Sequence, residues 1–286
     1  MYYKYRYLLL LLGGIIIFSC STKKNTTTTR FYHNLTTHYN VYFNGVESYK
    51  KGLKSAENSI ENDYTQILPI FLYSDKNVSQ RVYSDMDRAI QKVTKAINLH
   101  SITAKPEMKK GQLTEKDKEF YERMEYNKWI DECYLLMGKS YLYRQEYGLA
   151  KDAFKYIINK YDYEPTIYNA QIWLLRCHNE KNEFRESEMI INLLKSDLEF
   201  PKDKLQGELD ISIADYHMKQ KEYQNAIPYL EKALEKTRDK YYKIRFTYIL
   251  AQLYQETNNP VKAFDTYGKV IKMNPPYAMT FNAKIN

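Results

Sequence analysis

The sequence contains few of the residues that break helices or build common enzymatic sites. Only 9 Gly and 8 Pro occur in 286 residues, which argues against a β-rich chain with many tight turns and against a Pro/Gly-rich disordered chain. No Gly-rich phosphate-binding loop is present. The 3 Cys form no Cys-x-x-Cys pair and the 5 His form no His-Glu-x-x-His pattern, so the usual zinc-site spacings are missing.

The remaining composition suits long helices and offers no recognisable catalytic site. No nucleophile, base and orienting group occur in a recognisable arrangement, so we expect no enzyme, no metal, no cofactor and no small-molecule substrate. The net charge is +8, and it falls to +6 (41 basic minus 35 acidic) without Lys4 and Arg6 of the N-terminal segment. This small excess shows no basic cluster with interleaved aromatic residues, so we expect no nucleic-acid partner.

Residues 1–19 have the pattern of a secretory signal peptide. Lys4 and Arg6 precede an apolar run from Leu8 to Phe18, which is too short for a permanent membrane span. The run ends at Ser19-Cys20, and this resembles a bacterial lipobox, which implies lipid attachment at Cys20. The alternative is a signal peptide that happens to contain a Cys. Residues 20–30 are polar and predict a lipidated tether that keeps the folded part close to the membrane.

Residues 31–118 predict a helical N-terminal unit with a polar insert. Helices are expected over 46–60 and 78–99, joined by a loop over 64–77 whose apolar residues should pack. Residues 101–118 predict a mobile surface insert, and a long helix is expected from near Lys118 to about Gln145. We expect this unit to cover the apolar end of the repeats that follow.

Residues 119–277 contain an internal repeat, written about four times. Short phrases end at Ala150, Ser187, Ala226 and Ala263, with steps of 37, 39 and 37 residues. Each phrase follows a small or apolar residue by twelve positions and a ring by nine, and a large apolar residue comes four positions later. This spacing predicts pairs of antiparallel helices in close contact. Residues 278–286 predict the start of a further helix.

The repeat spacing resembles the tetratricopeptide repeat (TPR). The resemblance implies an all-α TPR superhelix with an N-terminal helical cap unit, and a groove lined by the first helix of each repeat. In that family the groove binds peptides or partner proteins. The groove positions that we select as candidates for partner binding are Lys139, Asn169, Arg176, Asn179, Asp215, Arg245, Tyr248 and Gln252. We expect Lys139, Arg176 and Arg245 to hold acidic groups. We expect Asn169 and Asn179 to hold an extended backbone. The alternative is a solvated groove without a ligand.

The aromatic and Asn-rich phrase from His33 to Asn44, beside the lipobox and before the repeats, resembles the SprE/PorW-type TPR lipoproteins of gliding motility and type IX secretion. That family implies an outer-membrane lipoprotein that supports export, with other secretion and motility envelope proteins as partners. No acidic run follows Cys20, which in these bacteria favours the periplasmic side. The alternatives are a nutrient-binding lipoprotein of the SusD type and a general outer-membrane assembly lipoprotein. Trp129 and Trp173 both lie in or beside the repeats and suggest no sugar platform.

Three smaller expectations concern single residues. His178 and His217 occupy the ring position of their repeats, so we expect packed rings and not a metal pair. Cys133 and Cys177 lie on different repeat levels, so two separate thiols are favoured over a disulfide. The phrase from His33 to Asn44 has two interpretations, a packed cap or a docking surface for a membrane-embedded export component.

Overall fold

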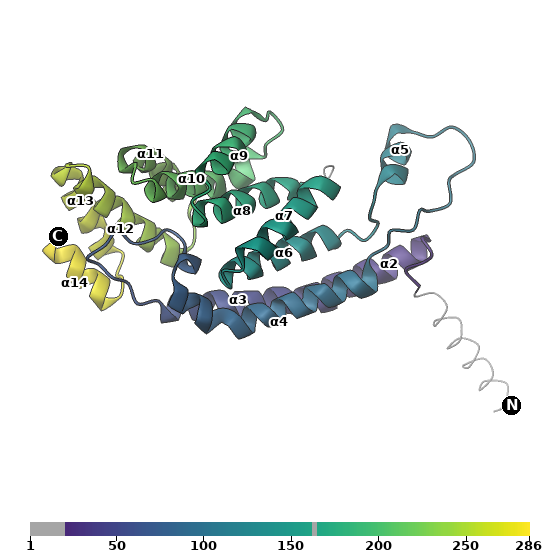
Figure 1. Cartoon of the computed structure of the whole chain (residues 1–286), viewed down its shortest axis with the longest axis horizontal. Helices are drawn as coiled ribbons and strands as arrows, with labels where there is room; N and C mark the ends of the chain where they lie inside the picture. Colours follow the sequence, from purple (N-terminus) through teal and green to yellow (C-terminus); the bar gives the residue numbers. More distant parts are fainter. Residues whose placement is uncertain (1–20, 162–164) are drawn as a thin grey trace, which may run out of the picture.

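The computed structural model describes residues 21–161 and 165–286 (Figure 1). This part of the chain is helical and contains no strand. The N-terminal unit consists of α2 (Thr27–Thr36), the π-helix η1 (Thr37–Tyr42), α3 (Phe43–Ser59), the short 3₁₀ helix η2 (Leu72–Ser74), α4 (Lys76–His100) and α5 (Glu115–Glu122). The repeats consist of α6 (Ile130–Tyr143), α7 (Tyr147–Lys160), α8 (Thr166–Glu180), α9 (Phe184–Ser196), α10 (Lys202–Lys219), α11 (Tyr223–Lys236), α12 (Lys240–Glu256) and α13 (Pro260–Lys272), followed by α14 (Tyr277–Ile285).

Helices α3 and α4 lie side by side along the length of the molecule, and α2 and η1 extend α3 toward the N-terminal end (Figure 1). The two expected helices over 46–60 and 78–99 are present with slightly longer bounds. Glycine permits the close approach of α3 to α4, because a Cβ added at Gly52 would lie 2.6 Å from the Cε of Met86. The α4 stripe Val82, Met86 and Val93 is fully buried.

The N-terminal unit covers the first repeat, as expected. Helix α4 packs against α6. Val93 and Ala96 of α4 form one apolar cluster with Cys133 and Leu136 of α6. The cap therefore removes from water an apolar surface that the first repeat of a solenoid would otherwise expose.

The expected tether is shorter than predicted from composition. Helix α2 begins at Thr27 inside the 20–30 segment, because Thr26 and Thr29 form a reciprocal capping box. The hydroxyl of Thr29 donates to the carbonyl oxygen of Lys24 at 2.9 Å, and the side chain of Asn25 donates to the carbonyl oxygen of Ala104 at 2.6 Å. Polar composition alone hides these contacts, and the described chain is attached to the body from Lys24 onward.

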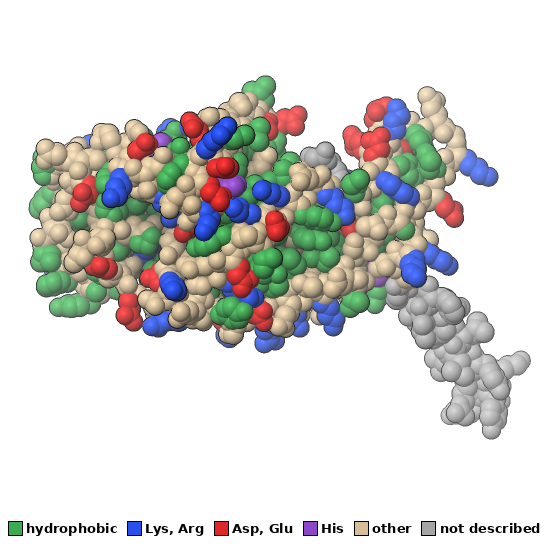
Figure 2. Space-filling view, viewed as in Figure 1, with side chains coloured by type: hydrophobic (Ala, Val, Ile, Leu, Met, Phe, Trp, Pro, Cys, Tyr) green, Lys and Arg blue, Asp and Glu red, His purple; other side chains and the backbone are tan. Residues whose placement is uncertain are grey.

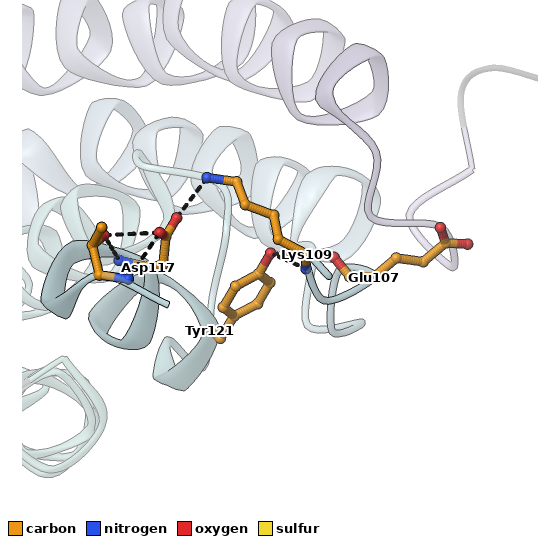
Figure 3. Close-up of polar contacts among 5 residues, drawn as sticks. Glu107, Lys109, Asp117 and Tyr121 are labelled. Atoms are coloured by element: carbon orange, nitrogen blue, oxygen red, sulfur yellow. Dashed lines mark hydrogen bonds and ion pairs between the residues drawn. The ribbon is translucent and has the colours of Figure 1, made fainter. Parts of the chain in front are cut away.

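The polar insert is a surface arm with its own contacts, although its composition predicted a mobile segment. The Nζ of Lys109 lies 2.7 Å from the carboxylate of Asp117, and the backbone N–H of Lys109 donates to the hydroxyl of Tyr121 at 2.9 Å (Figure 3). The Nζ of Lys105 donates to the carbonyl oxygens of residues 121, 122 and 123.

The expected helix from near Lys118 to about Gln145 is divided into two. Helix α5 ends at Glu122, and α6 begins at Ile130. Between them the carboxylate of Glu125 accepts the backbone N–H groups of Ile102, Tyr126 and Asn127. These hydrogen bonds stabilise the non-helical segment between α5 and α6. No local pattern in the sequence predicts them.

Four helix pairs follow, α6–α7, α8–α9, α10–α11 and α12–α13, with the predicted period. Each pair turns at one residue with positive φ, and these residues are Gln145, Asn182, Lys221 and Asn258. In each turn the residue after it donates its backbone N–H at 2.9 Å to the carbonyl oxygen of the repeat's ring residue. This left-handed turn ends the first helix and starts the second.

The small residues of the repeat lie where the paired helices approach each other. A Cβ at Gly138 would lie 2.5 Å from the ring of Phe154, so α6 and α7 can be this close only without a side chain there. Ala150 and Ala226 are fully buried. Helix α14 packs on α13 and begins one residue before the expected 278–286 segment.

Candidate partner-binding groove

The first helices of the repeats line an inner groove, and the chain itself fills part of it. We call residues 62–74 the groove segment. The side chain of Gln252 of α12 forms two hydrogen bonds with the backbone of the groove segment. The N–H of Leu68 donates to Oε1 of Gln252 at 3.0 Å, and Nε2 of Gln252 donates to the carbonyl oxygen of Gln66 at 2.8 Å. An amide of the groove thus holds an extended backbone, but the amide is that of Gln252 and not of Asn169 or Asn179, and the backbone belongs to the same chain.

Arg245 of α12 fastens the groove segment further. Its Nε and Nη2 donate to the carbonyl oxygen of Pro69 at 3.1 and 2.7 Å, and its Nη1 donates to the side chain of Asn62 at 2.7 Å. Only 1% of Arg245 is exposed. The ring of Tyr248 is fully buried and meets the ring of Tyr64 edge-on. Arg245, Tyr248 and Gln252 are therefore not available to a partner, which corrects their assignment as partner-binding residues.

The apolar side chains of the groove segment belong to the core. Leu68, Ile70, Leu72 and Tyr73 are buried, as the prediction of a packed loop over 64–77 required. Gln145 of the first repeat turn donates to the carbonyl oxygen of Tyr73 at 2.8 Å, and the hydroxyl of Ser74 donates to Glu180 at 2.6 Å. The groove segment therefore contacts the first, second and fourth repeats.

Arg176 of α8 stands between the groove segment and the repeats. Its guanidinium lies 4.5 Å from the ring centroids of Phe71 and Trp173. Its Nε donates to the hydroxyl of Ser212 at 2.8 Å, and its Nη2 pairs with the carboxylate of Glu208. The positive charge of Arg176 lowers the pKa of Glu208 from its ordinary value, with burial opposing the shift.

Beside the groove segment the groove is open, with a cavity of about 990 Å³. Its walls come from α3, the groove segment, α6, α8, α10, the end of α11 and α12. The side chains that face one another across it are mostly aromatic or charged. They include Tyr49, Phe71, Tyr73, Lys139, Tyr143, Trp173, Arg176, Glu208 and Tyr242. A cavity of this size can hold a few residues of an extended peptide.

Lys139 is a half-buried cation of this cavity that forms no ion pair within the described chain, whereas Lys204, Lys236 and Arg238 on the same cavity are exposed. Among the residues that the structure describes, no hydrogen-bond acceptor or carboxylate lies within bonding distance of its Nζ, which stands 5.0 Å from the ring centroid of Trp173. Burial lowers the pKa of the Lys139 ammonium, although the carboxylates of Glu132 and Glu208 oppose the shift. The buried hydroxyl of Tyr73 on the same cavity also has no hydrogen-bond partner. The cavity therefore contains two donors, on Lys139 and Tyr73, that no acceptor of the described residues satisfies.

Three other predicted groove residues do not line this cavity. Asn179 is fully buried and donates to Asp215 at 3.0 Å and to the carbonyl oxygen of Ser212 at 3.0 Å, while Ser187 donates to Asn179 at 2.8 Å. Burial raises the pKa of Asp215 to about 6. Asn179 and Asp215 thus join neighbouring repeats and do not face a partner, and the half-buried Asn169 lies outside the cavity wall.

The Cys and His residues of the repeats are buried or bonded within the chain. Cys133 and Cys177 are free and buried, as predicted. His178 and His217 each bond across their turn, to Glu183 at 2.5 Å and to Glu222 at 2.7 Å. Within the described ranges no group of three His, Cys, Asp or Glu side chains is arranged to hold a metal ion. Figure 2 shows charges of both signs interspersed over the face in view.

Sequence reasoning missed the aromatic walls of the cavity. Tyr49, Tyr143 and Tyr242 come from three different helices, and only the superhelix brings them together. The signal that pointed to the groove segment was its apolar run from Ile67 to Leu72 around Pro69. Such a run without helix-forming context predicts packing, but it does not name the surface that it packs on.

Two observations concern the expected membrane anchor. Cys20 lies outside the described residues. Across residues 21–161 and 165–286, every helix is too short or too polar to cross a bilayer.

Comparisons with known proteins agree with the repeat architecture. The tetratricopeptide repeat family model matches residues 211–237, which span the second half of α10, the turn and α11. The apo form of the quorum sensor NprR from B. thuringiensis is similar with a TM-score of 0.54 and 14% identity, over 98% of this chain and 74% of that chain. A tetratricopeptide repeat protein from Parabacteroides merdae ATCC 43184 is similar with a TM-score of 0.46 and 15% identity, over 90% and 91%. No curated protein matches the chain. The chain is a TPR superhelix.

Proposed function

We propose that this protein is a lipid-anchored TPR scaffold that holds an acidic, extended segment of another envelope protein in its open groove cavity. It acts without catalysis, supports protein export through the type IX secretion system and gliding motility, and sits at the outer membrane facing the periplasm. The observation that carries the binding step is the cavity of about 990 Å³ with Lys139 unpaired on its wall.

The chemistry of the cavity favours a peptide with an acidic group. Lys139 supplies a positive charge without an anionic partner, and Arg176 still has an Nη1 for which the described residues provide no acceptor. Aromatic walls suit apolar side chains on either side of the acid. The groove segment shows how the same superhelix holds an extended backbone, through the amide of Gln252. A partner strand in the cavity would use donors that the fold leaves open.

The anchor and the place of action come from the sequence. The lipobox-like Ser19-Cys20 and the phrase from His33 to Asn44 support an outer-membrane lipoprotein of the secretion and motility machinery. Replacing Cys20 by Ala should abolish palmitate labelling and move the protein out of the membrane fraction. Labelling that persists in Cys20→Ala would refute the anchor.

The partner can be captured from intact envelopes. A benzoylphenylalanine photo-crosslinker at Lys204, an exposed residue on the cavity, should capture a secretion or motility component that mass spectrometry identifies. The same group at Lys269, exposed on α13, is the matched control. Capture at Lys204 should fall in a Lys139→Met background. Equal capture at both positions, or capture that ignores Lys139→Met, contradicts binding in the cavity.

The SusD-type alternative is disfavoured by the surroundings of Trp173. Two cations, Lys139 and Arg176, stand over its ring, and Trp129 is stacked on His38 at 3.7 Å between ring centroids. Neither ring is a free platform for a sugar. A glycan-binding assay on the purified protein separates this alternative, and the identity of the captured partner separates a general outer-membrane assembly role from export.

A further inference from the structure

A stripe of large apolar side chains is exposed on the continuous helical segment of α2, η1 and α3, which we call the N-terminal rod. We call Phe31, Leu35, Tyr39 and Phe43 the aromatic stripe. Their exposed fractions are 68%, 45%, 69% and 54%, high for residues of this kind in a folded chain. They repeat every four residues along α2, η1 and the start of α3. The aromatic stripe therefore forms an apolar edge that nothing in the described chain covers.

The π-helical turn keeps this edge on one side. In an α-helix, four residues turn about 40° more than one full turn, so a four-residue repeat drifts around the axis. A π-helix has a wider turn and rotates less per residue. Because η1 lies between Leu35 and Phe43, it reverses the drift that the α-helical steps on either side produce. The irregular turn thus aligns side chains that a regular helix would spread.

The opposite side of the same rod is firmly packed. His33 and His100 face each other with 2.8 Å between their Nδ1 atoms. Asn127 donates to the hydroxyl of Thr37 at 2.8 Å, and Val41 is buried. The cap interpretation of this phrase is therefore correct for one side. It leaves the aromatic stripe on a rigid support, facing outward.

The chain segment that carries the aromatic stripe is basic up to Glu47, which is exposed at the next four-residue step after Phe43. Residues 21–46 contain no Asp or Glu, and Lys23, Lys24 and Arg30 precede the stripe. Lys23 and Lys24 are exposed, and the side chain of Arg30 is held beside Asn25 at 2.6 Å. A basic segment with interfacial aromatic residues is the composition of a helix that lies on an anionic bilayer.

The length of chain before the stripe places it near a bilayer. This step rests on the proposed anchor at Cys20. The carbonyl of Lys24 is held by Thr29, so four residue steps separate Cys20 from the folded body. They span at most about 14 Å when extended. A tether this short leaves the N-terminal end of the rod little room to stand away from the lipid.

We propose that the aromatic stripe docks on the anionic lipid surface itself, so that the rod lies against the membrane while the repeats extend away from it. The anchor supplies one attachment and the stripe supplies the second, which fixes the orientation of the groove. The competing occupant is a membrane-embedded export protein, and vesicles that contain lipid alone separate the two.

The test uses the full acylated chain in vesicles of phosphatidylethanolamine with a minority of phosphatidylglycerol. An environment-sensitive dye is attached to Tyr39→Cys, and to Phe264→Cys as control. Phe264 is an equally exposed ring, 78%, on α13 at the other end of the chain. Cys133 and Cys177 are buried, and unlabelled parent protein controls for them. Spin-labelled lipids should quench the dye at 39 and leave the dye at 264 bright.

A second experiment removes the anchor. In a Cys20→Ala background, the double variant Tyr39→Ser/Phe43→Ser should partition onto these vesicles roughly three- to tenfold more weakly per ring removed. The double variant Val261→Ser/Phe264→Ser should not change partitioning. All four side chains are exposed, so thermal melting should stay unchanged in both.

The outcomes separate the stripe from the anchor. Flotation of the acylated chain without quenching at 39 overturns lipid docking, leaves the anchor intact and favours a protein occupant. No flotation and no quenching refutes both. Equal quenching at 39 and 264 shows unspecific adsorption and also overturns the inference. Quenching at 39 that weakens with added salt supports it, because the basic residues contribute through screened charge.

Discussion

The groove has a part filled by the groove segment and an open part with the cavity, and both are lined by polar side chains from the first helices of the repeats. These side chains are bonded within the chain in the filled part, and one of them, Lys139, is without a partner from the described chain in the open part. In the filled part, Arg245 and Gln252 are buried and their hydrogen bonds go to backbone of the groove segment. In the open part, Lys139 lines a cavity and has no acceptor among the described residues. A buried polar group with a partner stabilises the fold, whereas a donor without a partner stabilises a ligand when one arrives. The position in a repeat does not distinguish the two.

The largest effect should come from Arg245→Met. The change leaves the carbonyl of Pro69 and the side chain of Asn62 without their donor in a partly buried site. We expect the free energy of unfolding to fall by about 2–4 kcal/mol. Arg245→Lys should not restore it, since one ammonium cannot replace the two-pronged contact with Pro69. Urea unfolding measures both.

The exposed Arg185→Met is the matched control and should unfold like the wild type. If Arg245→Met also unfolds like the wild type, the groove segment is not held in the groove by Arg245.

The same substitution in the open part, Lys139→Met, should have the opposite profile. Its ammonium has a lowered pKa, so the folded state holds the proton less tightly than the unfolded state. Burial of this charge destabilises the fold at neutral pH, and stability rises as pH increases through the lowered pKa. Lys139→Met should therefore keep or slightly increase stability and flatten the alkaline slope, which pH-dependent melting measures.

Lys139→Met should weaken the binding of the partner. Affinity for the captured acidic partner should fall about tenfold to a hundredfold, because a desolvated charge contact disappears. Titration of the purified partner provides the number. Unchanged affinity, with intact folding, would mean that the cavity does not hold the acid.

The periodicity of the sequence was sufficient to predict the repeats. It could not predict that the groove segment, residues 62–74, folds back into the groove. Gly138, Ala150 and Ala226 could be assigned to helix contacts because close packing needs small residues at fixed steps. The same register selected Arg245, Tyr248 and Gln252 as a binding surface. It failed there because nothing local indicates that residues 62–74 return over α12, more than 170 residues away in sequence.

Lys139 and Arg176 are the part of the candidate site that could be predicted from the sequence. Both occupy first-helix positions that face the groove, and both line the cavity. Asn179 and Asp215 occupy comparable positions but turn toward each other between repeats. Which of these happens depends on the neighbouring repeat, such as Ser187 donating to Asn179. Patterns within one repeat do not contain that information.

Asp215→Asn tests its assignment to the internal network. Burial raises the pKa of Asp215 to about 6, so the folded state binds its proton more tightly than the unfolded state. The contribution of Asp215 to stability should therefore improve as pH falls from about 7 to about 4. Over this range the wild type should gain about 1–2 kcal/mol relative to Asp215→Asn. The exposed Asp265→Asn should show no such difference in the same urea titrations. Parallel curves for wild type and Asp215→Asn would place this carboxylate in contact with water.

The smallest effect compares two turns with the same backbone. Gln145 and Lys221 have φ values of 58° and 61°, a conformation that costs a side chain about 1 kcal/mol and a glycine almost nothing. Lys221 is exposed and gains nothing in return, so Lys221→Gly should stabilise the protein by roughly 0.5–1 kcal/mol. Gln145 uses the same turn to donate to the carbonyl oxygen of Tyr73 in the groove segment. Gln145→Gly should gain the turn energy and lose that bond, and the two terms are of similar size. Differential scanning calorimetry on both variants should show a higher Tm only for Lys221→Gly. An equal rise in both would mean that Gln145 does not hold the groove segment.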